Sequence, residues 1–136
     1  MLEDWLLRKK EIEDSKDTLK GADLCYAKLM EAKLSNANLE EADLTAAYLI
    51  RADLSGANLS GADLTQAVLS EANLSGADMN EAELTDTFLN GANLKGVVNL
   101  TCDQIELANI DKDTVLPSYM TIKWSNDRIC ECVDGN

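Results

Sequence analysis

The stretch ANLSGADLTQAVLSEANLSGADMNEAEL, residues 57–84, repeats a unit of five residues. A typical unit contains Ala, a small polar or acidic residue, Leu and two further residues, and the units run without insertion from Asp17 to Gly96. Fifteen of the sixteen central positions are Leu, with Met79 as the exception, and Ala precedes the centre by two residues in all units except those with Asp17 and Thr87. This repeat is therefore the feature that determines the fold.

A period of five residues fits neither regular secondary structure. On a helix, residues five apart point about 140° away from each other, so the Leu side chains would be spread around the circumference. On a flat strand, alternate Leu side chains would point to opposite faces. A chain that turns a corner every five residues can instead point every Leu and Ala inward, which predicts a coil around an aliphatic core.

The exceptions to the repeat indicate how many corners close one coil. The residue before the central Leu is mostly Asp or Asn, yet Lys28, Tyr48, Val68 and Phe88 recur there at intervals of twenty. Four units per turn would stack like residues on one another, at the spacing of about 4.8 Å that interstrand hydrogen bonds impose. Residues 17–96 are thus predicted to form four coils, whose open ends need caps.

Tandem A(D/N)LXX units of this kind resemble the pentapeptide repeat family. The resemblance implies an all-β solenoid, a right-handed quadrilateral β-helix, for residues 17–96. It also implies the square cross-section and the handedness, whereas the inward Leu and the period of twenty follow from the sequence itself.

The flanking segments are predicted to cap the two ends of this solenoid. In residues 1–16, one face of a helical wheel is apolar, which favours a capping helix over the alternative of a partner-binding helix; its residues are Leu2, Trp5, Leu6 and Ile12. In residues 97–136, Thr101 and Gln104 form a capping-box pattern that predicts a short helix at about 101–108. This ending resembles that of cyanobacterial and plastid family members.

The cysteines predict one disulfide. Cys25 belongs to the first coil and would lie about 19 Å from Cys102, much farther than bridged Cα atoms. We expect Cys102 to pair with Cys130, or alternatively with Cys132, and to stabilise the cap by about 3–4 kcal/mol. A zinc site at these two C-terminal cysteines is disfavoured, since the chain has no His.

The compartment is expected to be cytoplasmic by the absence of a signal peptide, or a thylakoid lumen or periplasm for a processed, disulfide-bonded form.

Two outer surfaces are candidates for function. The first is an apolar stripe that would form a protein-binding patch, or would merely shield the wall of the solenoid; its residues are Met30, Tyr48, Ile50, Val68 and Phe88. The second is a ladder of carboxylates that would be a solvated face or, alternatively, a calcium site; its residues are Asp23, Asp43, Asp63 and Glu83.

The amino-acid composition disfavours several classes of function. Without His, and with a tight Leu core that leaves no pocket, we expect no enzyme, no cofactor and no metal. A net charge of −13 disfavours direct binding of nucleic acid or an anionic membrane. We expect a monomeric scaffold or protein–protein interaction module whose protein partner the sequence does not identify. The alternative, which the family resemblance suggests, is a DNA mimic that binds and protects or inhibits DNA gyrase, although a short rod with Leu centres departs from that pattern.

Overall fold

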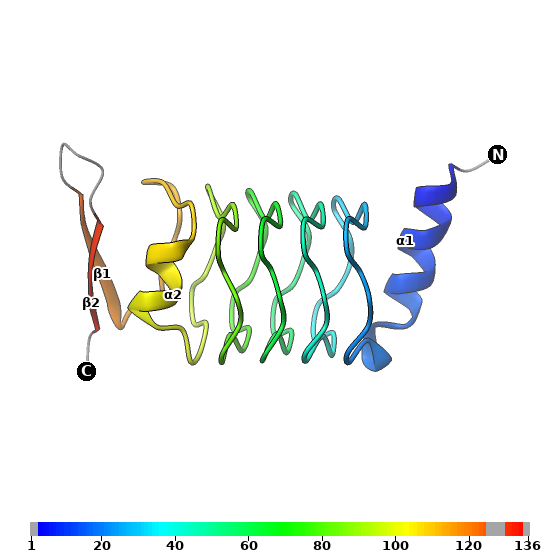
Figure 1. Cartoon of the computed structure of the whole chain (residues 1–136), viewed down its shortest axis with the longest axis horizontal. Helices are drawn as coiled ribbons and strands as arrows, with labels where there is room; N and C mark the ends of the chain where they lie inside the picture. The colour runs from blue at the N-terminus through cyan, green and yellow to red at the C-terminus, as the bar shows by residue number, and fades with distance from the viewer. Residues whose placement is uncertain (1–2, 125–129, 135–136) are drawn as a thin grey trace.

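The chain forms a stack of coils with a different structure at each end (Figure 1). The computed structural model describes residues 3–124 and the backbone of 130–134. Helix α1 (Asp4–Asp14) and the 3-10 helix η1 (Lys16–Thr18) precede the coils, and helix α2 (Cys102–Leu107) follows them. Strands β1 (Met120–Trp124) and β2 (Cys130–Asp134) then form an antiparallel hairpin. Among the described residues, neither helix is long and apolar enough to cross a membrane.

The core is a single column of aliphatic side chains. From Leu29 to Leu94 every central residue of the repeat, Met79 included, is at most 1% exposed. This confirms the prediction that the central residues point inward. Thr87, which replaces Ala in one unit, is fully buried, and its hydroxyl donates to the Leu64 carbonyl at 2.6 Å. A polar group in the core is tolerated there because it has a hydrogen-bond partner.

Backbone hydrogen bonds hold each coil to the next. Parallel bridges join residues twenty apart, such as Tyr48 with Val68 and Val68 with Phe88. The Leu29 N–H donates to the Tyr48 carbonyl at 2.7 Å, and the Tyr48 N–H donates to the Ala27 carbonyl at 2.9 Å. The predicted vertical stacking at a period of twenty is therefore confirmed, and the coils form a right-handed quadrilateral β-helix.

Each corner requires a left-handed backbone conformation. Every fifth residue from Gly21 to Gly96 has a positive φ, between 55° and 72°. The turn is closed by a bond such as that from the Ala47 N–H to the Leu44 carbonyl at 3.0 Å, with a positive φ at Ala46 between them, as type II turns require. Glu31 and Ala46 adopt this conformation without being Gly, so the ladder bonds on both sides must outweigh the local strain.

Helix α1 lies at the N-terminal end of the coils (Figure 1). Ile12 is its one buried residue among those described, whereas Trp5 and Leu6 are half-buried, and Leu2 lies outside the described residues. A carboxylate oxygen of Glu13 accepts the Lys33 N–H at 2.7 Å, and the Lys16 carbonyl accepts the Asn38 N–H at 2.8 Å. These groups replace the carbonyls that a preceding coil would supply.

The ladder continues beyond the repeats at the other end. Val98 bridges to Asp78, Asn109 to Phe88 and Val115 to Asn93, so three walls gain a further rung after residue 96. Between Val98 and Asn109, where the next rung above Glu83 would fall, the chain forms α2 instead. The division of the chain at residues 1–16, 17–96 and 97–136 therefore stays a prediction, and the last rungs belong to the segment that follows the repeats.

Gln104 joins α2 to the last regular coil. The Thr101 side chain accepts the Gln104 N–H, and Gln104 Oε1 accepts the Thr101 N–H at 2.8 Å, which forms a capping box. The same side chain donates through Nε2 to the Met79 and Ala82 carbonyls at 2.8 and 2.9 Å. One amide therefore starts the helix, supplies a donor to the Ala82 carbonyl, and adds a second donor to the Met79 carbonyl, which also accepts the Ala82 N–H at 3.1 Å.

Replacing Gln104 with Ala is expected to lower the free energy of unfolding by about 1–3 kcal/mol, because the Ala82 carbonyl loses this donor and the Thr101 N–H loses its acceptor. Gln104→Glu keeps the acceptor for Thr101 but removes the donors, so it is expected to destabilise as well. Urea unfolding followed by circular dichroism measures both, with Glu106→Ala on the exposed side of α2 as control. Equal midpoints for Gln104→Ala and the control would contradict this role.

Candidate functional site

The predicted apolar patch lies on one wall of the solenoid. We call Met30, Tyr48, Ile50, Val68 and Phe88 the apolar wall. The bridges stack Tyr48, Val68 and Phe88 in consecutive coils, and the two rings keep 43% and 41% of their surface exposed. The side chains of Met30 and Ile50 are half-buried. The structure thus brings together the residues that the spacing predicted to be neighbours, and it leaves both aromatic rings accessible.

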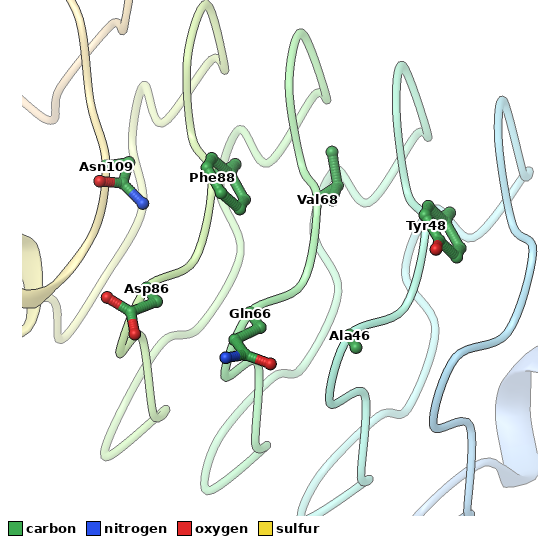
Figure 2. Close-up of a pocket in the computed structure, with 7 residues that line it drawn as sticks. All are labelled: Ala46, Tyr48, Gln66, Val68, Asp86, Phe88 and Asn109. Carbon is green, nitrogen blue, oxygen red and sulfur yellow. The ribbon is translucent and has the colours of Figure 1, made fainter.

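An open groove runs beside the aromatic rings. Its volume is about 440 Å³. Figure 2 shows two rows of side chains along it, with Tyr48, Val68 and Phe88 in one row and the corner residues in the other. The groove forms because Val68 is shorter than the two rings on either side of it. The remaining lining residues are Ala46, Gln66, Asp86 and Asn109.

A second hollow extends the apolar wall toward the N-terminus. It measures about 320 Å³ and is lined by Trp5, Lys28, Met30, Tyr48 and Ile50. Sequence reasoning assigned Trp5 to the capping face of the helix and missed its position beside this wall. A helical wheel gives the face of a helix on which a residue lies, but not the wall of the solenoid over which that face rests.

The carboxylates of the predicted acidic ladder also stack in consecutive coils. Asp43 Oδ1 accepts the N–H and the hydroxyl of Thr45 at 3.0 and 2.6 Å. Asp63 makes the same two bonds with Thr65 at the same distances. The ladder therefore has a local structural role, since each Asp fixes the residue two positions later.

Cys25 takes the place of Thr in the first coil of this wall. Ligand atoms of Asp23, Cys25 and Asp43 lie within 4.8 Å of one another. A hydrogen bond to Asp43, together with burial and the Asp23 carboxylate, raises the pKa of the Cys25 thiol to about 12. The same bond and those from Thr45 lower the pKa of Asp43. The thiolate is the form of Cys that binds metals. Because the thiol of Cys25 is held in its protonated form, it acts here as a hydrogen-bond donor to Asp43.

Cys25 is expected to react with iodoacetamide at pH 8 at least about tenfold more slowly than an unperturbed thiol, because its thiolate fraction is small. The rate should rise as the pH approaches 12, the pKa of this thiol. Asp43→Asn should accelerate the reaction, whereas Asp53→Asn, at the equivalent position of another wall, should not. Mass spectrometry of the Cys25 peptide measures the rate, and equal rates for both variants would contradict the assignment.

The predicted disulfide falls partly outside the described residues. Helix α2, which begins at Cys102, lies against β2. Strand β2 carries Cys130 and Cys132, and its side chains are not among those described. The pairing of Cys102 with Cys130 or Cys132 therefore stays a prediction.

The repeats match a known family. Residues 19–56, 27–66 and 57–96 match the sequence profile of pentapeptide repeats, a profile of 8 copies. The chain belongs to the pentapeptide repeat family. This confirms the resemblance on which the handedness and the square cross-section were expected. No functionally curated protein matches this pentapeptide repeat protein in sequence.

Solved structures of similar fold come from several sources. Trypsin-treated QnrB1, a plasmid-mediated fluoroquinolone resistance protein, has a TM-score of 0.57 at 22% identity, with 68% of this chain and 48% of QnrB1 covered. The chain thus spans about half the length of QnrB1. The pentapeptide repeat protein alr5209 from Nostoc PCC 7120 is 30% identical over 83% of this chain and 85% of its own, with a TM-score of 0.47. A pentapeptide repeat protein from the Arabidopsis thaliana thylakoid lumen is 28% identical over 83% and 68%, with a TM-score of 0.38.

Proposed function

We propose that this pentapeptide repeat protein is a monomeric, non-enzymatic binding module of four coils that holds a protein partner on its apolar wall. The observation that carries the proposal is the pair of exposed rings, Tyr48 at 43% and Phe88 at 41%, which flank an open groove. Aromatic side chains are enriched in the cores of protein–protein interfaces. The family is generally non-catalytic, which agrees with a role in binding.

The wall is a favourable surface for binding because its backbone is already ordered. Tyr48, Val68 and Phe88 each lie in a rung that is bonded to its neighbours. A rigid surface loses little conformational entropy when a partner binds, so more of the contact energy contributes to affinity.

Shielding of the backbone does not require aromatic residues. On another wall the equivalent positions are occupied by Asp53, Asn73 and Asn93. The carboxylate or amide oxygens of these side chains accept local backbone N–H groups at 3.0 Å, and the ladder is complete there too. Small polar side chains thus complete a wall, which leaves the rings of Tyr48 and Phe88 available for another role.

The double variant Tyr48→Ser with Phe88→Ser is expected to lose at least one partner that the wild-type protein captures from a lysate of the source organism, because it removes the two rings. The matched control is Asp53→Ser with Asn73→Ser, at the same repeat positions on another wall. Quantitative mass spectrometry compares the three captures at equal protein load. A partner set that is unaltered in the Tyr48 and Phe88 variant would refute the proposal.

The charge distribution favours this module over the gyrase-binding DNA mimic. A duplex mimic needs negative charge on opposite faces. Here the wall with Lys33 and Lys95, which also carries Asp53, lies opposite the wall with the acidic ladder. The side of the solenoid that holds the apolar wall also carries Lys28 and Arg51 as well as Glu31 and Glu71, so the formal charges on that side cancel. The likeness to QnrB1 supports the shared fold alone.

Purified protein at micromolar concentration is therefore expected to leave the supercoiling activity of DNA gyrase unchanged, both with and without a fluoroquinolone. An agarose-gel assay with relaxed plasmid measures this, and bovine serum albumin at the same concentration serves as control. Inhibition of supercoiling, or protection against the drug, would favour the DNA mimic instead.

A further inference from the structure

We infer that the partner segment is a basic amphipathic helix that lies along the axis of the solenoid. Its apolar side chains would contact the apolar wall, and its Lys or Arg side chains would reach the acidic residues of the neighbouring wall. This inference rests on the proposed function and adds the chemistry of the partner.

The two borders of the apolar wall differ in charge. On one border Arg51 lies between Glu31 and Glu71, and its nitrogens are 3.3 Å from a carboxylate oxygen of each. The one Arg offsets one of the two Glu charges, so this border keeps a formal charge of −1. An additional cation would find less unpaired charge there than on the other side of the apolar wall.

The other border holds carboxylates that the chain does not neutralise. We call Asp23, Asp43, Asp63, Glu83 and Asp86 the acidic wall. Within the part of the chain that the structure describes, none of these five carboxylates forms an ion pair with a Lys or Arg. Stacked carboxylates about 4.8 Å apart repel one another unless cations lie near. A row of Lys or Arg side chains from a partner would relieve this repulsion.

The hydrogen bonds of the ladder leave acceptor capacity for a partner. Thr45 and Thr65 use Oδ1 of Asp43 and Asp63, and Thr85 uses Oε1 of Glu83. A carboxylate has two oxygens and about four lone-pair sites, so each can accept a further charge-assisted bond. The local bonds also hold the carboxylates in position, which lowers the entropic cost of such contacts.

The groove joins the two chemistries. Its lining includes the rings of Tyr48 and Phe88 from the apolar wall and Asp86 from the acidic wall. Figure 2 shows Asp86 in the same row as Gln66, beside Phe88. The other residues of that row, Ala46 and Gln66, are neutral, and by chain order the remaining carboxylates of the acidic wall lie beyond this row. A segment in this groove would therefore meet apolar surface on one side and, toward the acidic wall, the negative charge of Asp86 and of the ladder, which is the pattern that an amphipathic basic helix complements.

The spacing of the rungs favours a helix over an extended strand. Rungs repeat about every 4.8 Å, and a helix repeats its face about every 5.4 Å, so one turn can meet one rung over a few coils. Residues on one face of a strand repeat about every 6.6–6.8 Å and fall out of step after one rung. The five bridged positions from Lys28 to Asn109 enclose four such spacings, about 19 Å, or about thirteen helical residues at 1.5 Å each.

The test uses three fluorescein-labelled peptides of eighteen residues. The first has Leu at helical spacing on one face and Lys elsewhere, the second has Glu in place of Lys, and the third has the composition of the first in an order without an apolar face. Fluorescence anisotropy measures the Kd of each for the full-length protein at low and high salt. The variants are Tyr48→Ser with Phe88→Ser, Glu83→Gln with Asp86→Asn, and, as a control for charge, Glu41→Gln with Glu81→Gln on another wall.

The Leu/Lys peptide is expected to bind at least about tenfold more tightly than the other two and to weaken as salt is added. Both variants of the groove should weaken it several-fold, and the Glu41 and Glu81 control should not. Equal binding of the Lys and Glu peptides, or of the ordered and reordered Lys peptides, would overturn the inference. The inference would also be overturned by a solution dimer that Tyr48→Ser with Phe88→Ser abolishes. Binding to phosphatidylcholine vesicles that the same double variant abolishes would overturn it as well.

The lysate capture separates failure of this inference from failure of the proposed function. A partner that is lost with Tyr48→Ser and Phe88→Ser but retained with Glu83→Gln and Asp86→Asn would keep the binding module and discard the basic helix. A partner set that neither variant alters would discard both. Loss of the same partner with both variants, but not with Glu41→Gln and Glu81→Gln, supports both.

Discussion

The structure depends on one constraint, the backbone hydrogen bonds that place residues twenty apart beside each other in neighbouring coils. Each bond fixes the position of one coil relative to the next, as in the pair formed by Tyr48 with Leu29 and Ala27. Once this register is set, every central Leu lies over the Leu of the previous coil, and every outer position lies over its equivalent. Core, walls and grooves all follow from the same period, because a change of one residue would shift every side chain out of its column.

The backbone hydrogen bonds between coils also offset the conformational strain at the corners. Each corner places one residue at positive φ, including residues such as Ala46 and Glu31 for which this conformation is unfavourable. The bonds above and below each corner hold it in place. At the ends of the stack no next coil supplies these bonds, and side chains supply some of them instead. The Glu13 carboxylate accepts the Lys33 N–H, and the Gln104 amide donates to the Ala82 carbonyl. Closure of the ends is thus achieved by individual side chains as well as by packing.

The outer walls are free to differ because the core uses only the inward positions. Leu and Ala fill the axis on every side, so the residue before the central Leu can be aromatic on one wall, acidic on the next and amide-bearing on a third. Tyr48 and Phe88 stay exposed although the residues directly after them are fully buried. Binding properties can therefore change on one wall without disturbing the core.

The sequence by itself determined the period, the inward Leu and Ala, and the stacking of Tyr48, Val68 and Phe88. In a strict repeat the residue twenty positions away is the neighbour in the next coil, so these contacts can be read from the spacing alone. The position of Trp5 beside the apolar wall, the bond between Cys25 and Asp43, and the rungs at Asn109 and Val115 were decided only by the tertiary structure. These features lie at the ends of the solenoid or combine different walls and coils. There the repeat no longer specifies the neighbours, and contacts depend on how the helix and the irregular segments pack against the last ordered coil.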